Sequence, residues 1–190
     1  MTALETYLKT YFGVTTDELK LISSFFKTVA LTKGEFFLKA GRLSDRLGFV
    51  QSGILREYVV QEDKEVTKWI STQGYFAVDL ASFVFNQPAR WNIQALSDCE
   101  LSVICSDDYK KINQVVANWT ELEKLFIASC FTVLEERILT HLSKTAEERY
   151  RQLFDYNREL FNLVPLQYLA SMLGMTPETL SRLRKKSIVK

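Results

Sequence analysis

The sequence predicts an α+β protein in which helices flank a domain of short antiparallel strands. Three observations support this fold class: a helical period in residues 1–28, closely spaced β-rich runs between residues 30 and 104, and a helical period again after Asp107. Several short strands at this spacing are typical of an antiparallel sandwich or roll, because a βαβ fold would place helices between them.

The amino-terminal region is predicted to form two helices. The first presents one apolar face, made of Leu4, Tyr7, Leu8, Tyr11 and Phe12. Thr16 and Asp17 are suited to begin a second helix. That helix carries Leu19, Ile22, Phe25 and Phe26.

The β region consists of short runs, most of them ended by turn residues such as Lys33-Gly34, Ser52-Gly53 and Gln73-Gly74. The predicted strands are residues 35–39, 47–51, 55–60, 66–71, 91–95 and 100–104.

A long helix is predicted from about residue 120 to residue 145, and it carries two apolar stripes. The first stripe comprises Leu122, Phe126, Ser129 and Val133. The second comprises Ile127, Phe131, Leu134, Ile138 and Leu142. A helix that lies on one domain needs one stripe, so two stripes predict packing on its own β domain and on a second copy of the chain. The alternative, a helix buried in a single core, stays open.

The charge distribution is uneven along the chain. Residues 176–190 contain five basic residues and one acidic residue, a local net charge of +4; since the whole chain carries +1, residues 1–175 carry −3. A basic tip on an acidic body is typical of a module that places one end on the phosphates of a nucleic acid.

Other features indicate a cytoplasmic protein that does not enter a membrane. The longest uncharged apolar run is far shorter than the roughly 18 residues of a membrane span. The amino terminus lacks the basic start of a signal peptide. Cys99, Cys105 and Cys130 are scattered without metal-ligand spacing, which suits reduced thiols, and no metal site is predicted.

Residues 166–186, LQYLASMLGMTPETLSRLRKK, have the spacing of a DNA-reading helix-turn-helix. Gly174 stands where the turn demands a backbone that few other residues tolerate, and Ala170 stands where the two helices approach closely. Thr176 is suited to cap the second helix, Pro177 to its first position, and Glu178 to the positive end of its dipole.

The second helix of this window carries groups that can reach DNA. Arg182 is predicted to contact guanine, Glu178 to accept from cytosine, and Thr179 or Ser181 to assist them. The remaining predicted DNA-binding residues, mostly for phosphate, are Gln167, Thr176, Pro177, Arg184, Lys185 and Lys186. A second interpretation stays open: two short amphipathic helices whose basic end merely complements the dipole.

This order of elements resembles the Crp/Fnr family of bacterial transcription regulators. Lys33-Gly34-Glu35, Lys39-Ala40-Gly41 and Phe49-Val50-Gln51-Ser52-Gly53 look like the strands of that family's roll. AEERY (146–150) and GMTPETLSRLRKK (174–186) are similar to regulators from Bacteroidetes-type bacteria.

The resemblance implies three parts. They are an amino-terminal antiparallel β jelly roll of the cyclic-nucleotide-binding type (residues 1–115), a dimerisation helix (116–145) and a carboxyl-terminal helix-turn-helix (146–190). It also implies a cytoplasmic homodimer that binds a palindromic site on double-stranded DNA, with RNA polymerase and a small-molecule effector as further candidate partners. Only residues 187–190 follow the basic helix, so the full β-hairpin wing usual in the family is not expected.

The family's cyclic nucleotide pocket is not matched, so cyclic AMP binding is not expected and no cofactor is predicted. Val78 and Asp79 stand where the pocket has glycine and glutamate, and Ala89 stands at the position of the phosphate-binding arginine, with Arg90 one residue later. Strand side chains alternate faces, so this shift directs Arg90 away from the pocket. Two interpretations stay open for a group of five residues: they line a pocket for another ligand, or they belong to the core and surface of the roll. The five are Asp79, Phe83, Phe85, Arg90 and Trp91.

The sequence therefore predicts a sequence-specific DNA-binding regulator. The alternative is a ligand-sensing or protein-interaction roll whose helix-turn-helix is vestigial. An enzyme is not expected, because a metal-dependent roll enzyme needs two or three histidines, and His141 is the chain's single histidine.

Overall fold

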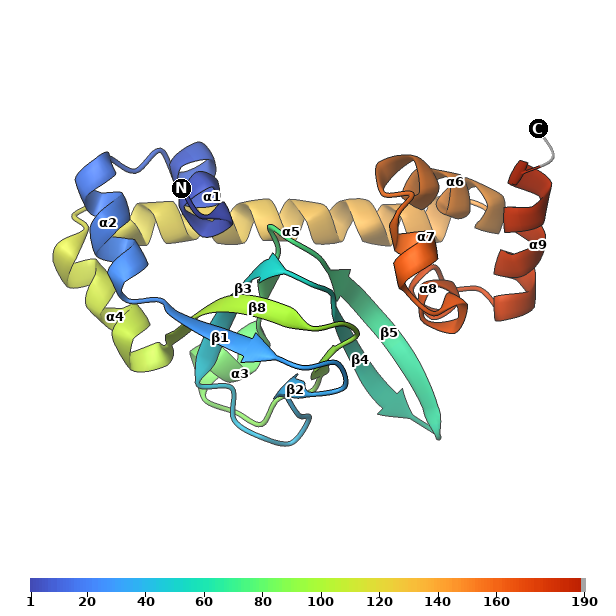
Figure 1. Cartoon of the computed structure of the whole chain (residues 1–190), viewed down its shortest axis with the longest axis horizontal. Helices are drawn as coiled ribbons and strands as arrows, with labels where there is room; N and C mark the ends of the chain where they lie inside the picture. The colour runs from blue at the N-terminus through green and yellow to red at the C-terminus, as the bar shows by residue number, and fades with distance from the viewer. Residues whose placement is uncertain (189–190) are drawn as a thin grey trace. The chain divides into compact units, whose positions relative to one another are not determined.

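The computed structural model describes residues 1–188, and the chain divides into two compact units (Figure 1). Unit 1 comprises Met1–Val59 and Ile70–Ala128, and unit 2 comprises Val60–Trp69 and Ser129–Lys190. The limits of the three predicted parts, at residues 115 and 145, stay a prediction.

The two predicted amino-terminal helices are confirmed as α1 (Ala3–Phe12) and α2 (Thr16–Ser24). Each begins with a capping box, Thr2 with Glu5 and Thr15 with Glu18, in which side chain and backbone satisfy each other's amide groups. Both helices bury their apolar faces in the core of unit 1, through Leu4, Leu8, Leu19 and Ile22.

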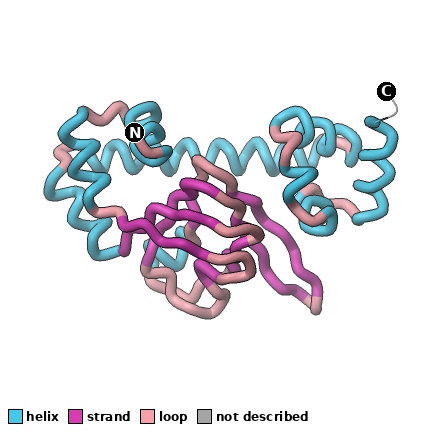
Figure 2. Tube along the Cα trace, viewed as in Figure 1, coloured by secondary structure: helices cyan, strands magenta, loops and turns pink. Residues whose placement is uncertain are grey.

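The strands of the described residues form two four-stranded sheets, which confirms the predicted antiparallel jelly roll (Figures 1 and 2). The first has the order β1 (Lys27–Leu31), β8 (Cys99–Cys105), β3 (Arg46–Ser52) and β6 (Phe76–Ala77). The second has the order β2 (Phe36–Leu38), β7 (Asn92–Ala95), β4 (Leu55–Gln61) and β5 (Lys64–Ser71).

Alternation along β3 divides the hydrophobic core of unit 1 in two. Leu47 and Phe49 pack with the cluster that includes α1 and α2, whereas Val50 packs with the residues between the sheets. Gly48 lies against the Phe37 ring, where an added Cβ would come within 3.0 Å of the ring carbon Cζ. The roll is thus packed tightly on both faces of this strand.

Four elements within the described residues were not predicted: β1, β6, α3 (Leu80–Phe85) and α7 (Leu160–Leu163). In β1 only Val29 and Leu31 pack on the core, and both are half-buried, while β6, α3 and α7 are very short. After β8 the chain forms α4 (Ser106–Val115), in keeping with the helical period expected past Asp107.

The predicted long helix is confirmed as α5 (Trp119–Ser143). Leu122 and Phe126 pack on unit 1, where the Phe126 ring lies 5.6 Å from Phe12 and 5.0 Å from Phe76 between centroids. Val133 of the same stripe is 51% exposed, and Ser129 is exposed too. The first stripe therefore contributes packing in unit 1 only through its amino-terminal residues.

The carboxyl-terminal part of unit 2 contains α6 (Ala146–Tyr156), α7 (Leu160–Leu163), α8 (Leu166–Met172) and α9 (Pro177–Ile188). Tyr150, Phe154 and Phe161 pack their rings together, with neighbouring centroids 5.4 to 5.6 Å apart. Leu169, Ala170 and Leu180 are almost fully buried where α8 meets α9. No helix within residues 1–188 is both long and apolar enough to span a bilayer.

Candidate nucleic-acid interface

Helices α8 and α9, called here the α8–α9 pair, are joined by the turn Leu173–Thr176. Gly174 has a left-handed backbone with φ +65°, a conformation that few other residues tolerate, as predicted for this glycine. The Met175 amide donates to the Ala170 carbonyl at 3.0 Å and closes the end of α8. The Thr176 hydroxyl accepts from the Thr179 amide at 3.2 Å, so Thr176 caps α9 as predicted, with Pro177 at the first helical position.

Two arginines from other helices hold the carboxyl end of α8. Arg149 of α6 donates to the carbonyl oxygens of Leu173 and Gly174, and Arg137 of α5 donates to that of Met172 at 3.2 Å. These are the carbonyl groups that a helix end leaves without partners inside the helix, and cations there also complement its dipole. Sequence reasoning missed both anchors, because each joins segments far apart in the chain.

The hairpin β4–β5 also contacts α8 within unit 2. The Thr67 amide donates to the Ser171 hydroxyl at 2.9 Å, and the Arg137 guanidinium lies 5.0 Å from the centre of the Trp69 ring. Arg137 therefore links the hairpin to the end of α8, so this helix is held from two directions.

One face of α9 carries the groups best placed to meet a ligand. Successive helical residues turn by about 100°, so positions 177, 178, 181, 182 and 185 share a face. Together with Leu166 at the start of α8, the residues at those positions line a surface groove of about 540 Å³. They are Pro177, Glu178, Ser181, Arg182 and Lys185. Ser181 and Leu166 are half-buried and the other four are exposed.

The groove combines one carboxylate with two cations. The backbone amide of Glu178 and the side chain of Thr176 lower the pKa of the Glu178 carboxyl, which is therefore ionised at neutral pH. Arg182 stands one helical turn further along, and Lys185 follows it. The face therefore offers a hydrogen-bond acceptor and two charged donors, which are the side-chain types that read base edges and hold phosphate.

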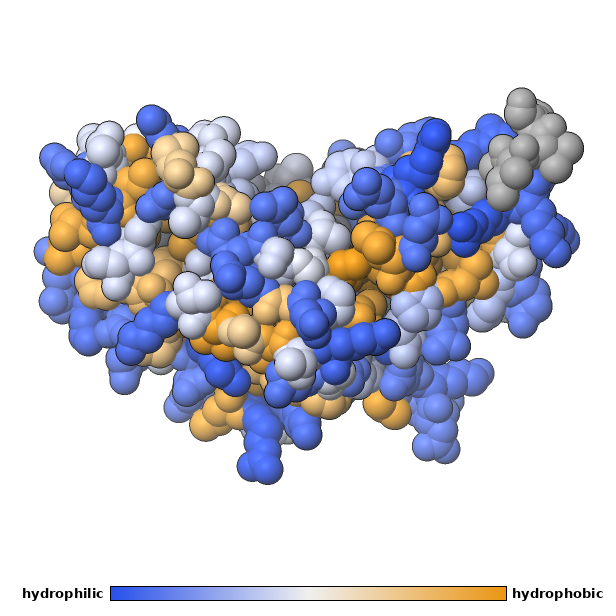
Figure 3. Space-filling view, viewed as in Figure 1, coloured by the Kyte–Doolittle hydropathy of each residue, from blue (hydrophilic) through white to orange (hydrophobic). Residues whose placement is uncertain are grey.

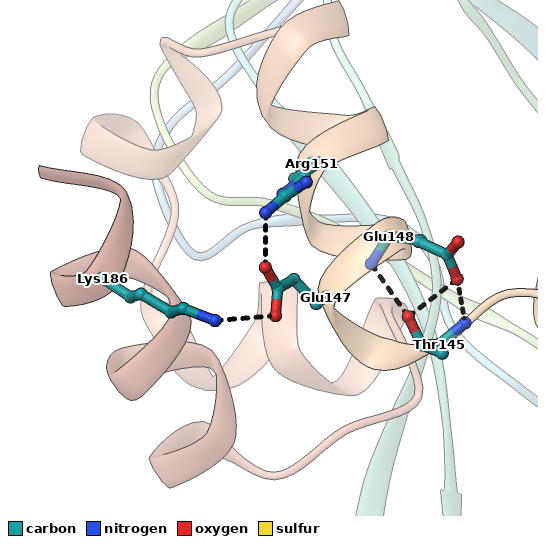
Figure 4. A network of polar contacts seen from close by, with 5 residues as sticks. All are labelled: Thr145, Glu147, Glu148, Arg151 and Lys186. Atoms are coloured by element: carbon teal, nitrogen blue, oxygen red, sulfur yellow. Dashed lines mark hydrogen bonds and ion pairs between the residues drawn. The ribbon is translucent and has the colours of Figure 1, made fainter. Parts of the chain in front are cut away.

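Other predicted DNA-binding residues have partners inside unit 2. Arg184 donates to the Asn162 side-chain oxygen at 3.1 Å, and Lys186 pairs with Glu147 of α6 at 3.2 Å (Figure 4). The Lys186 ammonium is the main cause of a lowered Glu147 pKa. Both contacts lie at the surface. They turn the charged ends of Arg184 and Lys186 toward α7 and α6.

Two more predicted DNA-binding residues, Thr179 and Gln167, differ in whether their side chains are available to bind DNA. The Thr179 hydroxyl accepts from Thr176 at 3.2 Å and the side chain is half-buried, so it serves the cap. Gln167 is exposed in the first turn of α8. Hydrophilic side chains gather on the visible surface around α6 and α9 (Figure 3).

The structure divides the five predicted ligand residues of the roll: Asp79, Arg90 and Trp91 are linked to one another, whereas Phe83 packs in the core and Phe85 is exposed. Asp79 is 3% exposed, and its carboxylate accepts from the Ser82 amide at 3.1 Å and the Arg90 amide at 2.8 Å. It caps α3 and ties the loop after that helix. Phe83 packs on Tyr109 in the core, whereas Phe85 is 74% exposed.

Arg90 and Trp91 have a local relationship of their own. The Arg90 side chain is exposed, and its guanidinium lies 5.7 Å from the centre of the Trp91 ring. Within residues 1–188, no three His, Cys, Asp or Glu side chains gather in a way that would hold a metal ion.

The roll matches the model of a known domain family. Residues 28–114 match the family model described as the cyclic nucleotide-binding domain. No curated protein matches the sequence. The matched segment covers nearly all of the roll and most of α4.

Solved structures of similar fold cover almost the whole chain. The chain is similar to the catabolite activator protein of Thermus thermophilus (21% identity, TM-score 0.59, 95% of this chain and 85% of that one). It is also similar to CLP, a c-di-GMP-responsive global regulator of Xanthomonas campestris (16%, 0.70, 92% of both chains). A third match is FixK2 of Bradyrhizobium japonicum (18%, 0.69, 85% and 83%). At these identities the likeness establishes a fold shared with Crp/Fnr-type regulators.

Proposed function

We propose that this chain is a Crp/Fnr-type transcription regulator that binds double-stranded DNA sequence-specifically as a homodimer in the cytoplasm. The observation that carries the proposal is the exposed face of α9, where Glu178, Arg182 and Lys185 line one groove beside the start of α8. The shared fold supports it, since the chain is similar over most of its length to proteins described as regulators.

In this proposal α9 is the recognition helix of a helix-turn-helix and lies in the major groove. Arg182 donates two hydrogen bonds to guanine, and the ionised Glu178 accepts from the amino group of cytosine. Ser181 assists between them, and Lys185 holds phosphate at the far end of the groove. Gln167 and the start of α8 are placed to meet the DNA backbone.

Arg184 and Lys186 act as phosphate contacts only after exchanging partners. Each must leave an intramolecular acceptor, Asn162 or Glu147, before it binds DNA. Their contribution is therefore smaller than that of Lys185, whose side chain already lines the groove.

Dimerisation through α5 supplies the second recognition helix. Ile127, Phe131, Leu134 and Ile138 are 45–60% exposed, and their spacing of four, three and four residues keeps them along one face of the helix. This is the seam of a two-helix contact, and a regulator that reads paired half-sites needs it. We call these four residues the α5 seam.

The roll is the candidate sensory part, and cyclic AMP is not its expected effector. The buried Asp79 carboxylate already accepts the Arg90 amide in the loop matching the family's phosphate segment, and it would repel a cyclic phosphate. Any effector is therefore a different small molecule, and RNA polymerase remains a candidate partner of the DNA-bound dimer.

Selection from a random-site DNA pool followed by sequencing tests the proposal. Enrichment of a palindromic motif by the wild-type protein, and its loss with Arg182→Ala, is the expected result. Recovery of no motif at low salt would overturn DNA recognition and favour the alternative of a sensory or interaction roll with a vestigial helix-turn-helix.

A further inference from the structure

The first turn of α9 presents hydrocarbon where a DNA-reading helix commonly presents a polar group. Pro177 is exposed at the first helical position and lines the groove, and its ring has neither a donor nor an acceptor. The neighbouring Thr176 hydroxyl bonds the Thr179 amide and hydroxyl. Beside Pro177, half-buried Leu166 also lines the groove, so its wall is apolar here.

We infer that this apolar wall selects a thymine by contact with its C5 methyl group, with Pro177 as the specificity-determining residue. The inference rests on the proposed function, because it assigns one base of the site that α9 reads. Thymine alone among the four bases presents a methyl group in the major groove; the other edge groups there are hydrogen-bond donors or acceptors. A proline opposite those groups would leave them without partners.

The charged part of the groove fixes where that thymine lies. Pro177 and Glu178 are consecutive, and an α-helix rises only about 1.5 Å per residue against about 3.4 Å per base pair. The thymine therefore stands within about one base pair of the cytosine whose amino group donates to the Glu178 carboxylate. Arg182, one turn further, reads the guanine beyond.

Replacement of thymine by deoxyuridine removes the methyl group and leaves base pairing intact. Starting from the operator obtained by random-site selection, each thymine of a half-site is replaced in turn, and the dissociation constant is measured by fluorescence anisotropy. One position should weaken binding about fourfold, the value of one buried methyl-sized group, and the others should change little.

Two variants test whether Pro177 causes the weaker binding to the deoxyuridine operator. Pro177→Ser keeps a residue tolerated at a helix start but removes the ring, so this variant should bind thymine and deoxyuridine operators equally. Lys185→Ala is the matched control in the same groove: it should weaken both operators and keep the fourfold ratio. Binding of Pro177→Ser to the deoxyuridine operator, close to that of the wild type, shows that the variant is folded.

The possible outcomes test the role of Pro177 and DNA recognition separately. A fourfold ratio that persists in Pro177→Ser, or no methyl-sensitive position in the operator, would overturn the role of Pro177 while leaving DNA recognition intact. Failure of the wild-type protein to select any sequence would overturn the proposed function, and this inference with it.

Discussion

Arg149 donates from Nε to the carbonyl oxygen of Leu173 at 2.9 Å, at the residue where α8 ends. The same guanidinium reaches the Lys144 carbonyl through Nη1 at 2.7 Å and the Gly174 carbonyl through Nη2 at 3.3 Å. One side chain thus joins the segment after α5 to the turn of the α8–α9 pair. Arg149 therefore anchors the turn that precedes α9.

Replacement of this anchor should loosen the α8–α9 pair. We predict that Arg149→Ala lowers the free energy of unfolding by about 2 kcal/mol, because it leaves carbonyl groups at a helix end without a charged donor. Arg149→Lys is the matched control, and it should recover less than half of the loss, since lysine lacks the forked geometry. Urea denaturation followed by circular dichroism measures both; a full recovery by lysine would show that charge alone is responsible.

The turn glycine gives a second prediction. Gly174→Ala should cost about 1–2 kcal/mol, because the position has φ +65° and an L side chain is strained there. Gly13→Ala is the matched control, with φ +61° and nothing within 4 Å of the new Cβ. At Gly174 the Cβ would lie 3.4 Å from His141 Cδ2, an ordinary van der Waals contact, so the two losses should be nearly equal.

A much larger loss at Gly174 than at Gly13 would contradict this reading. It would show that close packing on His141, and not the backbone, limits the turn. Thermal unfolding of the two variants and of the double variant Gly174→Ala/His141→Ala separates the cost of backbone strain from the cost of packing on His141.

The sequence was most informative where the determinants are local. Gly174, Thr176 and Pro177 act through the backbone conformation and hydrogen bonds of their own segment, so their roles could be predicted and are confirmed. The strands were predictable for the same reason, because alternation and turn residues are short-range patterns.

Features that depend on distant contacts could not be predicted. The pairing of Lys186 with Glu147 spans 39 positions, and a cation next to an acid many residues away leaves no local pattern. Asp79 was considered for a ligand pocket, but its neighbour Arg90 lies across a loop, and only the folded chain shows the bond between them. β1 was missed because only two of its residues, Val29 and Leu31, turn toward the core, which is too short an alternation to stand out in the sequence.

The α5 seam gives a prediction about assembly. Phe131→Glu combined with Ile138→Glu should convert a dimer into a monomer, because both side chains are 60% exposed in one chain and like charges would face each other across the contact. Sedimentation velocity measures the change. DNA affinity should fall with it, because single half-sites bind weakly.

Val133→Glu is the control for this assembly test. Val133 lies about 200° around the helix from Phe131 and is 51% exposed, so the substitution places the same charge on the opposite face. It should leave the dimer intact. Dissociation by Val133→Glu, with retention of the dimer in the double variant, would assign the contact to the other face.

The cap of α6 predicts a pH dependence. Hydrogen bonds from the backbone amide and the hydroxyl of Thr145 lower the pKa of Glu148, so its folded pKa lies below its unfolded one. Its stabilising contribution is therefore complete above the unfolded pKa and is lost as the pH falls through the folded pKa.

The stability difference between wild type and Glu148→Gln should accordingly shrink between about pH 7 and about pH 3. Urea denaturation at each pH gives the difference. An increase of the wild-type advantage in acid would contradict the assignment of the capping carboxylate.

The most direct test compares Arg182→Ala with Lys185→Ala on the selected operator and on random duplex DNA, by fluorescence anisotropy over a range of salt. Arg182→Ala should cost about 1–3 kcal/mol on the operator, spare random DNA and relax selection at one base pair. Lys185→Ala should weaken both DNAs alike and reduce the salt slope by about one, with a smaller effect for Lys186→Ala. Equal losses on operator and random DNA for Arg182→Ala would contradict base recognition by α9.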